Sequence, residues 1–194
     1  MSLEVILYPH PTLRFVSQPI RKVDAELKRI AAEMLDLMYE SNGVGLAANQ
    51  VNLPLRMFVI NPTGTRGEGE EYVILNPEIQ FPKGNETAEE GCLSLPGLTG
   101  DVIRPKSIRV SAFDISGKPF EATLEGFLAR VFLHEFDHLD GTLFFDRMGK
   151  ESLAELGGGL EELELDFRSR QKTGSLASDE ELIAQLSEWT DRYC

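Results

Sequence analysis

The sequence predicts an α+β fold in which antiparallel strands pack around a central helix, with a C-terminal helical extension. Three patterns predict this fold: an amphipathic helix near the N-terminus, a hairpin in the middle of the chain, and a strongly apolar helix directly after it. At 194 residues the chain has the length of about one domain. We expect residues 1–148 to form the core domain and residues 149–194 to extend it.

The first half of the chain predicts one helix and two strands. Residues 24–41 place apolar side chains at three- and four-residue steps, with Asp24 as N-cap and Asn42-Gly43 as the stop. A glycine-rich uncharged stretch follows. Strands are expected at 57–60 and 72–75, separated by a loop, and Asn76-Pro77 is expected to close the second strand.

The second half predicts a hairpin followed by helices. Residues 107–114 alternate apolar and polar side chains, and a turn at Ser116-Gly117-Lys118 leads into 119–124. Residues 125–139 form a helix that is apolar on more than one face, so we expect it to be central and buried. Beyond it, leucines spaced for a helix are interrupted by Gly157-Gly158-Gly159. A polar linker over 171–178 and a last helix from Ser178 to about Arg192 complete the chain.

Charge and cysteine content exclude several classes of function. Nineteen basic and 32 acidic residues give a net charge of −13, which argues against binding to nucleic acid or to anionic membranes. Two cysteines, Cys92 and Cys194, are too few for a disulfide framework. The N-terminus does not resemble a signal peptide, and the chain has no apolar run of about 18 residues. We therefore expect a cytoplasmic protein without membrane association.

The apolar helix carries an HExxH motif, His134-Glu135-Phe136-Asp137-His138. Residues four apart lie on one helical face, so both imidazoles can reach one metal ion. Glu135 can then contact a metal-bound water. The alternative is a pair of core histidines satisfied by hydrogen bonds, but two imidazoles and a carboxylate would be costly to bury without a partner.

A catalytic site of this type needs a third protein ligand and an open position. Cys92 is the better candidate, because it lies in Glu90-Gly91-Cys92-Leu93-Ser94-Leu95-Pro96-Gly97, whose glycines and proline fix a loop. The remaining histidine, His10, lies far upstream between two prolines and is interpreted as a loop residue.

Three motifs together resemble the peptide deformylase family: Gly43-Val44-Gly45-Leu46-Ala47-Ala48-Asn49-Gln50, Glu90-Gly91-Cys92-Leu93-Ser94 and the HExxH motif. Their order and spacing match that family over about residues 3–148. The resemblance implies hydrolysis of the formyl group from the N-terminal formylmethionine of newly synthesised polypeptides, releasing formate. It also implies one divalent metal ion per chain, with Fe²⁺ as the native ion and Zn²⁺, Ni²⁺ or Co²⁺ as substitutes. Its ligands would be Cys92, His134 and His138.

The resemblance also implies roles for the surrounding residues. Glu135 would be the general base, and the Gln50 side-chain amide and the Leu93 backbone N–H would stabilise the oxyanion. Gly45 would pair with the peptide main chain. Four residues would form the walls of the methionine pocket, Arg130 through its methylene stem: Val44, Phe127, Arg130 and Val131. Glu90 and Arg104 would form an ion pair that braces the Cys92 loop.

The sequence departs from the family at two places. Leu133 stands where a Gln commonly precedes the HExxH motif. Some members dock at the ribosome through a basic C-terminal helix, but residues 160–194 carry nine acidic and four basic side chains. The resemblance implies formylmethionyl nascent peptides as partners. Because the tail is acidic, we expect transient proximity to the ribosome without direct nucleic-acid binding. We expect the protein to be a monomer or a homodimer.

Two other classes of protein use comparable motifs. A zincin-type endopeptidase would cleave internal peptide bonds and would use a ligand other than Cys92. A structural metal-binding module would have four protein ligands and no open position.

Overall fold

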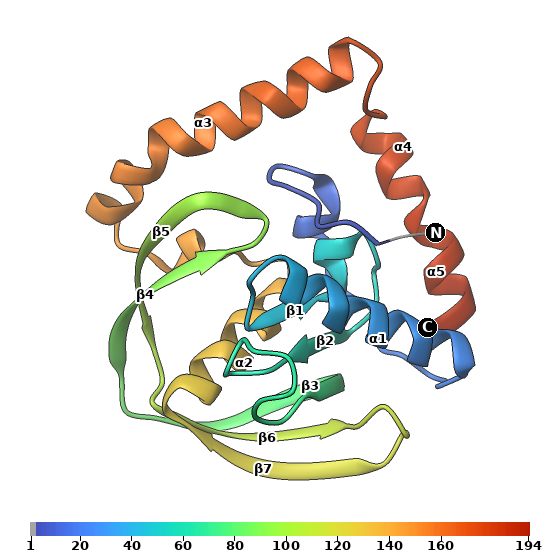
Figure 1. Ribbon diagram of the computed structural model, residues 1–194. Coiled ribbons are helices and arrows are strands. Elements are labelled where there is room, and N and C mark those ends of the chain that lie inside the picture. Colours follow the sequence, from blue (N-terminus) through green and yellow to red (C-terminus); the bar gives the residue numbers. More distant parts are fainter. Residues whose placement is uncertain (1–2) are drawn as a thin grey trace.

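The computed structural model describes residues 3–194 and contains helices and antiparallel strands (Figure 1). The α-helices are α1 (Ala25–Glu40), α2 (Gly126–Leu139), α3 (Lys150–Lys172), α4 (Asp179–Ala184) and α5 (Leu186–Tyr193). The strands are β1 (Gly45–Ala47), β2 (Met57–Ile60), β3 (Tyr72–Lys83), β4 (Glu86–Cys92), β5 (Leu95–Arg104), β6 (Ser107–Phe113) and β7 (Pro119–Glu125). Short 3-10 helices are η1 (Pro11–Arg14), η2 (Ala48–Val51) and η3 (Phe144–Arg147). The expected α+β class is confirmed.

The strands form a five-stranded sheet in the order β1-β2-β3-β6-β7 and a separate β4-β5 hairpin. Every strand pair is antiparallel. Helix α2 packs against β1, β2, β6 and β7, and Figure 1 shows it in the middle of the molecule. Phe58 of β2 and Phe132 of α2 meet edge to face with ring centroids 5.0 Å apart. The predicted hairpin at 107–124 and the largely buried helix at 125–139 are both confirmed.

Helix α1 begins and ends where its pattern predicts. The Asp24 carboxylate accepts a hydrogen bond from the Leu27 N–H at 2.9 Å, which satisfies an N-terminal donor. Asn42, in a left-handed conformation with φ of 57°, follows the end of the helix. The apolar face of α1 is buried in the core at Leu27, Ile30, Ala31, Met34 and Met38.

The prediction that Asn76-Pro77 closes the strand begun at residue 72 is wrong. β3 continues to Lys83, with an irregular register against β6 between Leu75 and Glu78. Asn76 absorbs the irregularity with φ of 48°, and its side chain bonds to both the N–H and the C=O of Ile20. An irregularity in the register therefore replaces the expected stop, and the Asn76 side chain ties it to Ile20, which lies 56 residues earlier in the chain.

Three strands occur where the sequence analysis predicted no strand. β1 lies in the glycine-rich stretch, and β4 and β5 include the segment around Cys92. Most side chains of β4 are exposed, and only Glu90 among them is buried. This hairpin therefore lacks the alternation of apolar and polar residues that identifies a half-buried strand.

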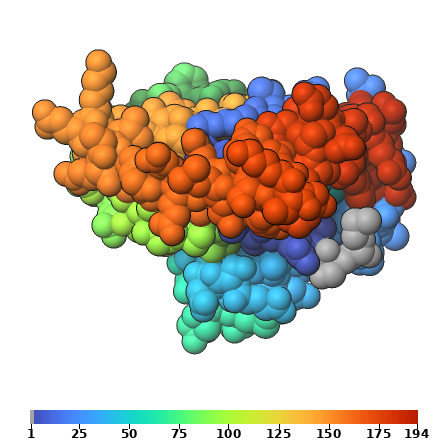
Figure 2. Space-filling model, turned by 90° about the horizontal axis from the view of Figure 1, so that it is seen from above, coloured from blue at the N-terminus to red at the C-terminus, as the bar shows by residue number. Residues whose placement is uncertain are grey.

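The C-terminal extension differs from its prediction in two ways. α3 runs without a break through Gly157-Gly158-Gly159, so the predicted interruption is wrong, and the linker is shortened to the residues between Lys172 and Ser178. The last helix is divided at Gln185 into α4 and α5, although Ser178 caps α4 as expected. Figure 2 shows the extension, coloured orange to red, across one face of the molecule.

The end of the extension is fastened to the start of α1. The Tyr193 ring is buried, its hydroxyl donates to Asp24 at 3.0 Å, and its backbone carbonyl accepts from Arg21 N–H at 2.7 Å. Cys92 and Cys194 are free thiols, and among residues 3–194 no helix is long and apolar enough to cross a membrane.

Candidate active site

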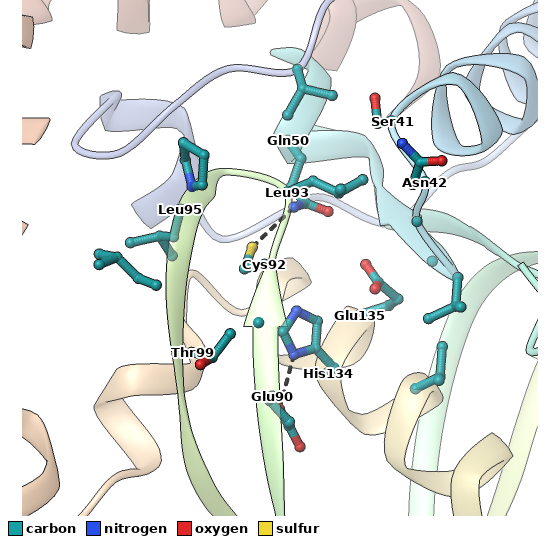
Figure 3. A pocket seen from close by; sticks show the side chains of 18 of the residues that line it. Ser41, Asn42, Gln50, Glu90, Cys92, Leu93, Leu95, Thr99, His134 and Glu135 are labelled. Carbon is teal, nitrogen blue, oxygen red and sulfur yellow. Dashed lines mark hydrogen bonds and ion pairs between the residues drawn. The ribbon is translucent and has the colours of Figure 1, made fainter. Parts of the chain in front are cut away.

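A cavity of about 590 Å³ lies between the segment after α1, the tip of the β4-β5 hairpin and α2 (Figure 3). Residues 41–45 form one wall, and residues 89–93 and 95–99 of the hairpin form the opposite wall. α2 contributes its N-terminal and middle residues, from Phe127 to Glu135. All three sequence motifs therefore meet at this cavity.

Three side chains bring potential metal ligands together beside the cavity. His134 and His138 lie one turn apart on α2, with ring centroids 5.0 Å apart. Cys92 approaches from β4, with Sγ 3.3 Å from His138 Nε2. The thiol and the two imidazoles offer donor atoms that all lie within 4.8 Å of one another.

This donor set fits a transition-metal cation. His134 Nδ1 is engaged by Glu90 Oε2 at 2.9 Å, which leaves Nε2 as its second ring donor. Burial lowers the pKa of His134, but hydrogen bonds to Cys92 and Glu90 outweigh burial and raise this pKa to about 10. The surroundings thus favour a positive charge at this point, and a bound cation would supply one.

His138 is buried more deeply than His134. Burial, reinforced by repulsion from His134, lowers the pKa of His138 well below its ordinary value and keeps the ring neutral. A neutral imidazole is the form that binds metals. Among residues 3–194 its Nδ1 atom has no hydrogen-bond partner.

Glu135 directly follows His134 on α2 and is 4% exposed. Burial raises the pKa of this carboxyl to about 7, against the attraction of His134 and Arg104. Its Oε2 atom has no hydrogen-bond partner within the part of the chain that the structure describes. A buried carboxylate with a pKa near neutrality, beside a cluster of metal ligands, can act as a general base.

A buried ionic network contacts His134 through the Glu90 carboxylate. Glu90 Oε1 accepts hydrogen bonds from Arg104 Nε at 2.6 Å and from Arg130 at 2.7 Å. Burial raises the pKa of Glu90, but hydrogen bonds from His134 and Arg104 outweigh burial and lower it to about 2. Glu90 therefore stays ionised and joins both guanidinium groups to His134.

Asp137 extends this network without entering the cavity. It accepts hydrogen bonds from Arg104 at 2.8 Å and from Arg147 at 2.6 Å. α2 is thus tied to β5 and η3 through one carboxylate. The pairing between Asp137 and Arg147 was not anticipated, because no spacing rule relates these two residues.

Gln50 lies above Cys92 and is 2% exposed. Its Nε2 donates to Cys92 Sγ at 3.3 Å and to Ser94 Oγ at 3.2 Å, while its Oε1 accepts from Ala47 N–H at 2.9 Å. The side-chain amide is thereby fixed with its N–H donors directed at the hairpin tip. Ser94 belongs to the motif around Cys92, but the sequence analysis gave it no role, and the structure shows it as a partner of Gln50.

The four predicted pocket residues all line the cavity: Val44, Phe127, Arg130 and Val131. Phe127 is 56% exposed, which places its ring at the rim. The guanidinium of Arg130 bonds to Glu90 and to the carbonyls of Glu86 and Val102. Arg130 is therefore more than a methylene stem, because its charge is part of the network behind His134.

The predicted site residues fall into two groups in the structure. Those lining the cavity include Gly45, Gln50, Glu90, Cys92, Leu93, His134 and Glu135, while Arg104 and His138 are buried and are not among the lining residues. His10 lies elsewhere, with its ring 6.0 Å from that of Phe167 in α3. The cavity is also lined by Leu98 and Thr99 of β5, which the sequence analysis did not name because they follow the loop expected at 90–97 and belong to no motif.

Comparisons with known proteins point to one family. The family model described as polypeptide deformylase matches residues 2–153. A peptide deformylase from Rhodopirellula baltica is 61% identical over 193 residues, covering 100% of this chain and 96% of that protein. A chloroplastic peptide deformylase from Solanum lycopersicum is 46% identical, and the match covers 88% of this chain but 61% of that longer protein.

Solved structures agree with the sequence comparisons. The crystal structure of a plant peptide deformylase superimposes with a TM-score of 0.84 at 42% identity, covering 89% of this chain and 93% of that chain. Fold and sequence therefore lead to the same group of proteins.

Proposed function

The chain belongs to the peptide deformylase family, and on that premise we propose that Cys92, His134 and His138 hold a divalent metal ion with Glu135 as general base. Enzymes of this family are metal-dependent hydrolases that remove the formyl group from the N-terminus of nascent polypeptides, and this chain is such an enzyme. The observation that carries the site assignment is the meeting of one thiol and two imidazoles within 4.8 Å beside a buried carboxylate.

The ion would supply Lewis-acid chemistry, since a bound divalent cation polarises a carbonyl and lowers the pKa of water. We propose Fe²⁺ as the native ion, with Zn²⁺, Ni²⁺ or Co²⁺ as substitutes. The mixed thiolate and imidazole set suits this group of metals better than Mg²⁺ or Ca²⁺, which prefer oxygen ligands.

Glu135 moves the proton in this scheme. Its carboxylate accepts a proton from the attacking water and returns it to the departing amine, so one group serves both halves of the hydrolysis. Burial raises the pKa of this carboxyl above its ordinary value, which makes it a stronger proton acceptor.

Gln50 and Leu93 would stabilise the negative charge that develops on the formyl oxygen. The Gln50 amide is held in place by bonds to Ala47 and Ser94, so little reorganisation is needed during the reaction. One such donor is typically worth about 3–4 kcal/mol. The Leu93 backbone N–H belongs to the same hairpin tip.

The remaining cavity residues would bind the peptide. Val44, Phe127 and Val131 offer apolar surface for the methionine side chain, and the aliphatic stem of Arg130 completes the pocket. Gly45 lies in edge strand β1, where an extended peptide can add as a further strand.

We also propose the setting in which the enzyme works. Residues 1–148 would carry the chemistry, with 149–194 packed on them as part of the same domain. The enzyme would act in the cytoplasm on peptides leaving the ribosome, as a monomer or homodimer. The net charge of −13 argues against direct contact with ribosomal RNA.

The experiment that tests this function is anaerobic purification with metal analysis, coupled to formate release from formyl-Met-Ala-Ser. We expect one metal ion per chain and formate production, with no cleavage of the internal peptide bonds of the substrate. Metal-loaded protein that releases no formate would contradict the assignment, and cleavage of internal bonds would favour a zincin-type endopeptidase.

A further inference from the structure

Helix α3 packs directly against a wall of the cavity, at β5 (Figure 1). At Gly159 of α3, an added Cβ atom would overlap Leu98 Cδ2 and lie 3.5 Å from Leu98 Cγ. Cβ atoms at the two preceding glycines, Gly157 and Gly158, would meet nothing within 4 Å. Of these three consecutive glycines, only the last occupies a position where an added methyl group would meet a neighbouring side chain.

Leu98 faces both α3 and the cavity. It lines the cavity, and it also belongs to an apolar cluster with Leu160 and Leu163 of α3. The same cluster includes Cys92 and Leu95, which pair with each other at the tip of the β4-β5 hairpin. The C-terminal extension therefore supports the hairpin tip that carries the proposed thiol ligand.

We propose that Gly159 is a positioning residue for the peptide groove. Having no side chain, it lets α3 lie close to β5 and leaves Leu98 in a place where it shapes the cavity without narrowing it. This inference rests on the proposed assignment of the cavity as the peptide site. It gives a role in substrate binding to an extension that lies largely beyond the family match at residue 153.

Adding a methyl group at residue 159 has a foreseeable consequence. Carbon atoms in contact are normally about 3.5–4.0 Å apart, so the end of the Leu98 side chain must move. Because Leu98 has α3 on one side and lines the cavity on the other, we infer that the displaced end of its side chain moves toward the cavity. Because only the end of a side chain moves, and alanine favours a helix more than glycine does, we expect binding rather than stability to suffer.

The test compares Gly159→Ala with the matched control Gly158→Ala in the full-length enzyme. Steady-state formate release from formyl-Met-Ala-Ser gives KM and kcat, while metal analysis and urea unfolding report on the site and the fold. We expect Gly159→Ala to raise KM about fivefold relative to Gly158→Ala, a modest fraction of what one methylene can contribute in a specificity pocket. We expect kcat, metal content and the unfolding midpoint to match those of the control.

A second background shows whether Leu98 carries the effect. When Leu98 is shortened by Leu98→Ala, adding Gly159→Ala is expected to cause no further rise in KM. If Gly159→Ala alone does not fold, the Leu98→Ala/Gly159→Ala double variant still tests the proposal. We expect this double variant to fold and to have the same KM as Leu98→Ala.

Three results would overturn the proposal: equal KM values for Gly159→Ala and Gly158→Ala, a rise in KM that persists in the Leu98→Ala background, or a loss of kcat with KM unchanged. The Glu135→Gln variant distinguishes an error in the role of Gly159 from an error in the active-site assignment. If Glu135→Gln retains turnover, the site assignment is wrong, whereas equal KM values beside an inactive Glu135→Gln overturn only the role of Gly159.

Discussion

Substitution of Gly45 by alanine probes how closely Glu135 is confined. Gly45 lies in β1, and a Cβ atom there would overlap Glu135 Oε1 and lie 2.8 Å from its Cδ. Because carbon atoms in contact are normally about 3.5–4.0 Å apart, the carboxylate must retreat by about 1 Å. Gly45 is not among the residues with positive φ, so alanine fits the backbone and the effect is steric.

A displacement of this size acts on the chemical step. Misplacing a catalytic group by about 1 Å can lower the rate about 100-fold, which corresponds to about 2.7 kcal/mol of activation free energy. We therefore expect kcat of Gly45→Ala to fall by about that factor while the metal content is unchanged. KM is expected to change little, because the main-chain groups of β1 remain available to the peptide.

The assay is formate release by the metal-loaded variant, with Gly158→Ala as the control for a glycine-to-alanine change in open space. Metal analysis of the same preparation excludes loss of the ion as the cause. Wild-type kcat in Gly45→Ala with its metal retained would refute the argument that a confined Glu135 carboxylate is required.

Three other predictions test the network, the N-terminal histidine and the extension. Glu90→Gln leaves the Arg130 guanidinium with backbone carbonyls as its partners and Arg104 with Asp137 as its remaining carboxylate. We therefore expect about 3 kcal/mol loss of unfolding free energy and about tenfold weaker metal binding; wild-type values in urea unfolding and metal titration would contradict this. Burial, opposed by the negative charge of Asp179, lowers the pKa of His10 from 6.5 to about 4. As the pH falls from 6.5 to about 4, His10 therefore takes up a proton in the unfolded chain before it does so in the folded protein, and the free energy of unfolding decreases. We expect His10→Asn to flatten this part of the pH profile of urea unfolding, and an unchanged slope would count against it. Tyr193→Ala removes a buried ring and should cost about 3 kcal/mol in the same assay, whereas the half-buried Cys194→Ser should cost little; equal stability of the two variants would show that the C-terminus is not part of the domain.

The elements that the sequence predicts well are those whose signals are local. α1, α2 and the β6-β7 hairpin each combine a clear period with a cap or turn, and each forms where expected. β4 and β5 carry mostly polar or exposed residues, and their pairing reaches from Glu86 to Arg104. Such a hairpin is stabilised by cross-strand hydrogen bonds that no apolar pattern records.

Tertiary packing also overrides local propensity in the extension. Three consecutive glycines normally weaken a helix, yet α3 continues through them. Its leucines pack on the apolar cluster beside β5, and Gly159 permits the close approach to Leu98. The contact that makes the third glycine acceptable lies 61 residues away in the chain (159 minus 98), so the sequence alone could not indicate it.

In the candidate site, too, the local features were predictable from the sequence and the long-range contacts were not. The spacing of His134 and His138 identifies their shared helical face directly, because four residues make about one turn. The position of Cys92 beside His138 depends on a contact across 46 residues. The burial of Glu90 and its ion pair with Arg130 depend on contacts between distant parts of the chain, so no local sequence pattern predicts them.

The central claim is that a metal held by Cys92, His134 and His138 acts together with the Glu135 carboxylate. Glu135→Gln tests it most directly, because the amide keeps the size of the side chain but cannot accept the proton. Metal content and formate release should be measured on the same anaerobic preparation. We expect one metal ion per chain with turnover lower by several orders of magnitude, and near-normal formate release by the metal-loaded variant would contradict the central claim.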